Sequence, residues 1–262
     1  MAAKKILVVN PEKSARVLPI DLAKRILPAV KKAVDEKKLN GNLGSVGTDL
    51  LSSAISKKFK EARNVKLGDD EFNDYLKKIR ENTSFIGAMG SYYWHKPDEI
   101  LDKKTNATHQ LYVSHREGLE NRLLALKAAE RLMKRMAKSG IIAKAKSLNP
   151  EFQANDAIIV YFNGARMKFD DLQKMVRESI KGSESAFAKE AYPLSTQVIN
   201  EIGGIGVSRS ASDKTSLTQI VSKAIAEEIA LFAQKNHRKP NEKELKELIV
   251  RAAQEIAPKC GW

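Results

Sequence analysis

The residues of this chain that are best suited to chemistry are lysines and arginines, and their densest group lies between Arg122 and Lys146. This segment holds eight basic residues against one acid, Glu130. On a helix of about 100° per residue, a single narrow stripe carries Lys127, Arg131, Lys134 and Lys138. Like charges at these spacings repel by roughly a few tenths of a kcal/mol per pair. The pattern predicts a helix that buries its apolar face and presents this stripe to an anion.

Further basic residues and a run of aromatic residues extend the predicted binding surface. The stripe continues at its ends with Arg122, Lys144 and Lys146. A second basic group consists of Lys57, Lys58, Lys60, Arg63 and Lys66, with only Glu61 opposing, and a third, looser set lies between residues 24 and 38. The aromatic run is Tyr92, Tyr93 and Trp94. Aromatic rings beside positive charge favour single-stranded nucleic acid, because bases stack on the rings while phosphates pair with the cations. The alternatives are a solvated lysine-rich face and aromatic residues buried in the core.

The basic surplus is distributed unevenly along the chain. The 262 residues include 46 Lys and Arg against 32 Asp and Glu, a net charge of +14. Residues 1–150 hold 30 basic against 17 acidic residues, whereas residues 151–262 hold 16 against 15. A one-sided surplus favours a face that meets a polyanion over a charge that serves solubility alone.

No motif identifies an enzyme, a metal site or a cofactor site. The glycine-rich segment 41–48 lacks the lysine of a phosphate-binding P-loop, and the glycines at 203–206 are typical of a turn. The four histidines are dispersed, which is unlike the ligand spacing of a metal site. We expect no catalytic residue, no metal and no cofactor, although an enzyme acting on nucleic acid remains a third reading.

The composition is typical of a globular protein inside the cell. No apolar stretch approaches the length of about 18 residues that a membrane helix needs. The lone Cys260 offers no internal disulfide, which favours a reducing compartment. We therefore expect a cytoplasmic protein without a transmembrane segment, or a virion protein if the source is viral.

The elements that must position these residues are mostly helical. We expect a mainly α, two-lobed protein with at most a small β-hairpin near residues 157–169, where Asn163-Gly164 favours a tight turn. The expected parts are an N-terminal arm (1–13), a basic helical lobe (14–150), a near-neutral lobe with the hairpin and further helices (151–256), and a tail (257–262).

Apolar periodicity and capping residues set the expected helices. Their ranges are about 22–34, 49–63, 69–80, 114–138, 170–180, 215–236 and 241–256. Pro28 predicts an end or a kink in the first of them. Asn241 with Glu244 three residues later is a variant of the capping box. The last two helices should pack as an antiparallel hairpin.

At the level of class, a basic helical lobe, a near-neutral lobe and terminal arms resemble viral nucleoproteins and filamentous coat proteins. The leading prediction is a homo-oligomeric protein that binds and packages nucleic acid independently of sequence, with RNA favoured over DNA. The alternative is a regulatory or effector protein that docks a basic face on an acidic protein or an anionic membrane.

Overall fold

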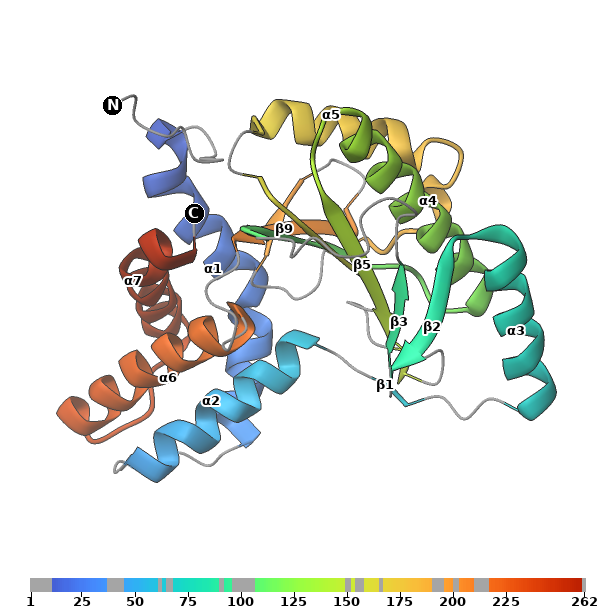
Figure 1. Ribbon diagram of the computed structural model, residues 1–262. Helices are drawn as coiled ribbons and strands as arrows, with labels where there is room; N and C mark the ends of the chain where they lie inside the picture. The colour runs from blue at the N-terminus through green and yellow to red at the C-terminus, as the bar shows by residue number, and fades with distance from the viewer. Residues whose placement is uncertain are drawn as a thin grey trace. The chain divides into compact units, whose positions relative to one another are not determined.

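The computed structural model divides the chain into two compact units (Figure 1). The described residues are 11–36, 45–60, 63–64, 68–89, 92–95, 107–148, 152–153, 158–164, 167–189, 196–199, 203–209 and 217–260. The unit called here the sheet unit draws its described residues from 62–208. The unit called here the helical unit draws them from 8–61 and 209–262. This division differs from the boundary near Pro150 that the sequence predicts, because the two ends of the chain meet in one unit.

Among the described residues, four α-helices build the helical unit. They are α1 (Pro11–Glu36), α2 (Ser45–Lys60), α6 (Leu217–Asn236) and α7 (Glu242–Cys260). Helix α1 packs on α2 and α7, and α6 packs on α2 and α7. Each helix contributes a buried apolar stripe, with Ile26, Ile55, Ile229 and Ile249 fully buried. Residues 11–13 belong to α1 and 257–260 to α7, so the described parts of the two predicted arms are helical; the other arm residues lie outside the described ranges.

The predicted capping box and helical hairpin are both present at the start of α7. The backbone N–H of Asn241 donates to Glu244 Oε2 at 2.8 Å, and the N–H of Glu244 donates to Asn241 Oδ1 at 3.0 Å. These two bonds satisfy N–H groups that have no partner within the helix. Helices α6 and α7 pack against each other, as predicted.

Helix α1 runs through Pro19 and Pro28 without a break, so the predicted end at Pro28 is wrong. A proline inside a helix removes one N–H donor and leaves a carbonyl of the preceding turn without its partner. Pro28 lies on the exposed side of α1, where water reaches the backbone. Ile26 and Val30 on the buried side keep their packing, which holds the helix together across the proline.

A seven-stranded sheet forms the centre of the sheet unit. Its strand order is β2 (Phe85–Met89), β3 (Tyr92–His95), β5 (Ala143–Leu148), β7 (Ile158–Phe162), β4 (His109–Val113), β9 (Ile205–Arg209) and β8 (Gln197–Val198). A separate two-stranded pair joins β1 (Arg63–Asn64) and β6 (Phe152–Gln153). The helices of this unit are α3 (Asp69–Asn82), α4 (Leu119–Lys138), α5 (Phe169–Ile180) and the 3₁₀ turn η1 (Glu184–Ala186).

The prediction of a mainly α protein is confirmed by seven α-helices among the described residues, whereas the β part is larger than the predicted hairpin. Strand β7 lies where the first hairpin strand was expected, but its neighbours are β4 and β5. The expected return strand over 165–169 is absent from its described residues, since α5 begins at Phe169. Strand β4 occupies 109–113 and α4 begins only at Leu119, later than the predicted start at 114.

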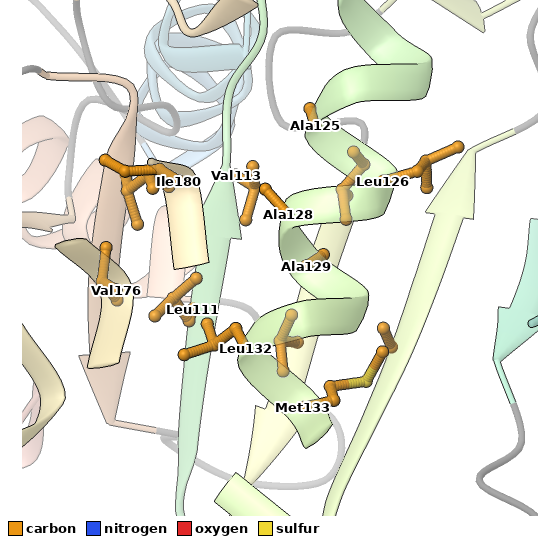
Figure 2. Packing of buried hydrophobic residues seen from close by; sticks show 14 of the residues in the cluster. Leu111, Val113, Ala125, Leu126, Ala128, Ala129, Leu132, Met133, Val176 and Ile180 are labelled. Carbon is orange, nitrogen blue, oxygen red and sulfur yellow. The ribbon is translucent and has the colours of Figure 1, made fainter. Parts of the chain in front are cut away.

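The core of the sheet unit lies between α4, α5 and one face of the sheet (Figure 2). Figure 2 shows Ala128 and Leu132 of α4 beside Val113 and Leu111 of β4, and Leu126 and Ala129 belong to the same buried cluster. Val176 and Ile180 of α5 join the same cluster and are almost completely buried. Alternating strand residues point to this face, so the register of the sheet decides which side chains meet α4.

Candidate functional site

Two of the stripe residues predicted to bind an anion, Lys127 and Arg131, instead form hydrogen bonds with other residues of the chain. Arg131 Nε donates to the Ser179 carbonyl oxygen at 2.7 Å, and its Nη2 donates to Ser183 Oγ at 3.0 Å. Lys127 Nζ donates to Asn82 Oδ1 at 2.9 Å. Both cations are half-buried between α4 and its neighbours. The stripe therefore joins α4 to the end of α3, to α5 and to the segment after α5.

The other two stripe residues are exposed. Lys134 pairs with the buried Glu130 of the preceding turn, Nζ to Oε1 at 2.8 Å. Glu130 also accepts hydrogen bonds from the backbone N–H and the hydroxyl of Ser84. Lys138 is exposed and forms no ion pair within the described ranges. Of the four stripe residues, only Lys138 therefore has no polar contact within the described ranges. The reason is that α3 and α5 pack along a side of α4 that the sequence pattern predicts to be exposed to solvent.

Arg122 is also taken into the core. Its side chain is 1% exposed, and its Nη2 donates to Ser147 Oγ at 3.0 Å. Ser147 lies opposite Ile158, which lies opposite Val113, so one row of the sheet connects β5, β7 and β4 beneath the start of α4. Arg122 joins the first turn of α4 to this row and is a structural residue rather than the exposed nucleic-acid contact that the sequence predicts.

His115 lies beside Arg122 and is buried, with 5% of the residue exposed. Its Nδ1 is 2.7 Å from the Arg116 carbonyl oxygen, so Nδ1 carries the proton and Nε2 carries the lone pair. Nε2 is buried and has no hydrogen-bond partner among the described residues. Burial, reinforced by the charge of Arg122, lowers the pKa of His115 to about 4. This imidazole stays neutral at physiological pH.

Lys144 and Lys146 alternate on β5 with the buried Ala143, Ala145 and Ser147. They therefore point to the face of the sheet away from α4. Both are half-buried, and Lys146 Nζ lies 5.3 Å from the centre of the Tyr161 ring. A cation at this distance from a ring is attracted by its π-electrons.

The aromatic run is part of β3, next to β5 in the sheet. The backbone register sets Tyr92 opposite Leu148, Tyr93 opposite Ser147 and Trp94 opposite Lys146. The side chains of these aromatic residues lie outside the described part of the structure, as do those of Lys60 and Arg63. The strand signal in Tyr92–His95 was missed, although aromatic residues favour strands.

The second basic group is brought together with part of the third in the helical unit. Lys58 Nζ of α2 pairs with Glu36 Oε1 of α1 at 2.7 Å. The charges of Lys32 on α1 and Lys57 on α2 also act on this carboxylate. We call Lys32, Lys57 and Lys58 the α1–α2 basic patch. The sequence shows the two groups separately, and only the packing of α1 on α2 joins them.

Ion pairs leave part of this patch uncommitted. Neighbouring lysines are paired across helices, Lys31 with Glu242 and Lys239 with Asp35. Lys32 and Lys57 are exposed and form no ion pair with another described residue. Segments 8–61 and 209–262 together hold 21 basic against 13 acidic residues, whereas the longer remainder holds 25 against 19. The surplus, which the sequence assigns to the N-terminal part, is therefore densest in the helical unit.

Over the described residues, no group of three or more His, Cys, Asp or Glu side chains is arranged to hold a metal ion. Within the same ranges, no helix combines the length and the apolar character needed to cross a membrane. A small apolar gap under α4 is lined by Val113, Ala129, Val176, Phe187 and Ile205, and it presents no charged group to a ligand.

Similarity to known proteins is found at the level of structure and not of sequence. No protein-family model matches the chain, and no curated protein sequence matches it. The solved structures that match include the effector protein from Pseudomonas syringae pv. syringae strain 61. The TM-score is 0.53 at 15% sequence identity, with 91% of this chain and 97% of that chain covered. At this identity the similarity concerns the fold alone.

This finding overturns the leading functional prediction. A packaging nucleoprotein or viral coat protein is contradicted, because the fold is similar to that of a bacterial effector protein. The RNA-binding role loses its main support as well, since Arg122, Lys127 and Arg131 are committed to contacts within the sheet unit. Neither nucleic-acid binding nor homo-oligomerisation is supported. The alternative reading of a regulatory or effector protein agrees better with the finding.

Proposed function

We propose that this chain is an effector-type regulatory protein that works inside a cell by docking a basic surface on an acidic partner protein. The observation that carries the proposal is the exposed cationic surface of the helical unit, where Lys32 and Lys57 form no ion pair within the described chain. The similar fold of an effector protein supports the effector class. The role is one of binding, and no catalytic step is part of it.

Charge complementarity explains how such a surface selects its partner. Exposed cations steer an acidic protein toward the patch and accelerate the encounter, and this effect weakens as salt screens the charges. The net charge of +14 also attracts acidic proteins over a longer range. Specificity then depends on where the cations lie rather than on their total number.

A titration with model polyanions tests this function. The full chain is titrated with a fluorescein-labelled polyglutamate peptide, an uncharged peptide of equal length, phosphatidylserine vesicles and single-stranded RNA. We expect the acidic peptide to bind in low salt, with an affinity that falls as salt rises, and the uncharged peptide not to bind. Absence of peptide binding, or tighter binding of vesicles or RNA at equal charge concentration, would overturn the proposal.

A further inference from the structure

Three lysines from two helices converge on one carboxylate in the helical unit. Glu36 Oε1 is 2.7 Å from Lys58 Nζ, and the two side chains are 47% and 25% exposed. Lys32 lies four residues before Glu36 on α1 and therefore on the same face of that helix. Lys57 precedes Lys58 on α2 and is exposed. The arrangement is a basic site with a carboxylate of the protein already bound to it.

Among the described residues, positive charge exceeds negative charge around this carboxylate. Asp35, the other acid at the end of α1, is engaged by Lys239 at 3.1 Å. Glu36 faces the charges of all three lysines of the α1–α2 basic patch. The hydrogen bond from Lys58 is the main cause that lowers the pKa of Glu36; burial opposes it, and the charges of Lys58, Lys32 and Lys57 reinforce it. One carboxylate leaves positive charge that a second carboxylate can neutralise.

We propose that the α1–α2 basic patch is the docking site for an acidic segment of the partner protein, and that Glu36 occupies this site as an internal competitor. The inference rests on the proposed function and names its surface. The site already holds a carboxylate in hydrogen-bonding geometry, which favours Asp and Glu side chains of a protein as its ligand. Lys32 and Lys57 would bind further carboxylates of the same segment.

The exposed geometry makes Glu36 an easily displaced competitor. Exposed ion pairs contribute little to stability, because water solvates both charges and the side chains lose freedom when they pair. An incoming acidic segment therefore breaks the Lys58–Glu36 pair at small cost and gains two further cations. Glu36 sets a threshold, so that single carboxylates bind poorly and a run of them binds well.

Substitutions of opposite sign test this arrangement with the polyglutamate peptide as the probe. Glu36→Gln removes the competitor, and the peptide affinity should rise at least about threefold. Lys32→Gln combined with Lys57→Gln should lower it by about tenfold or more. Lys243→Gln combined with Lys246→Gln is the matched control, because both lysines are exposed on α7 without an ion pair in the described chain. This control should change the affinity by less than about threefold.

The results distinguish a failure of the proposed function from a failure of the proposed docking site. If the unaltered protein binds no polyglutamate, the proposed function fails. If it binds, but the patch variant and the α7 control weaken binding equally, total charge governs binding and the docking site is wrong. If Glu36→Gln binds the peptide with unchanged or lower affinity, Glu36 is not an internal competitor. Thermal melts of all variants verify folding; should the double patch variant unfold, Lys57→Gln alone replaces it, and an unchanged affinity then refutes the site.

Discussion

The α4 helix and the α1–α2 basic patch place similar residues in opposite environments. On α4, Lys127 and Arg131 are half-buried and donate hydrogen bonds to Asn82, Ser179 and Ser183. In the patch, Lys32 and Lys57 are exposed and form no ion pair within the described residues. The sequence pattern is more regular on α4, where four cations follow helical spacing. Regular spacing of cations is therefore a poorer guide to a binding surface than the neighbours that the fold places beside them.

Of the substitutions considered, removal of Arg122 should lower the free energy of unfolding most. A small effect would contradict the contrast between structural cations around α4 and exposed cations in the patch. Arg122→Ala leaves a space in the core beneath α4 and removes the donor to Ser147 Oγ. Truncation of a large buried side chain, together with the loss of its hydrogen bonds, costs about 3–5 kcal/mol of unfolding free energy. Urea unfolding measures this change, with Lys57→Gln as the exposed control. A cost below about 1 kcal/mol would mean that Arg122 is not a structural cation.

Acid should weaken the sheet unit through His115. Its pKa of about 4 lies below the ordinary value of 6.5, so the unfolded chain takes up a proton that the folded chain refuses. The contribution of neutral His115 to the free energy of unfolding is therefore fully present above pH 6.5, and it is lost as the pH falls from 6.5 toward 4. The loss amounts to about 3 kcal/mol.

The measurement compares urea unfolding of the protein and of His115→Gln at several pH values in this window. The variant has no proton to bind at this position, so its stability should depend less on pH. An equal pH dependence in both proteins would show that other groups govern acid unfolding. One of them is Glu130: burial raises the pKa of its carboxyl, but the hydrogen bonds from Lys134 and Ser84 outweigh burial and lower that pKa.

The smallest effect should separate two residues of the same predicted stripe. Arg131→Gln removes the bonds to the Ser179 carbonyl oxygen and to Ser183 Oγ, and should cost about 1–2 kcal/mol. Lys138→Gln changes an exposed cation and should stay within about 0.5 kcal/mol. Thermal denaturation resolves the difference. Equal costs would mean that α4 packs along a different face from the one described.

Local patterns predicted the helices better than the strands. The expected ranges 69–80, 170–180 and 215–236 lie close to α3, α5 and α6, because amphipathic spacing and caps depend on residues a few positions apart. Strands such as β4 and β5 were missed. Their pairing joins residues far apart in sequence, as Leu111 and Ala145 each pair with Val160. Short strands depend on such partners for their stability, and the sequence of a strand contains little information about which partner it pairs with.

Local sequence patterns predicted the helical content and the capping box at Asn241, and the composition establishes the basic surplus and the lone Cys260. Which cations are exposed depends on the packing of the helices. A helical wheel orders the side chains around one axis, but it does not show that Ser179 and Ser183 receive Arg131, or that α2 brings Lys58 to Glu36. Solvent exposure is a property of neighbours distant in sequence, and it is exposure that separates a structural cation from one that binds a partner.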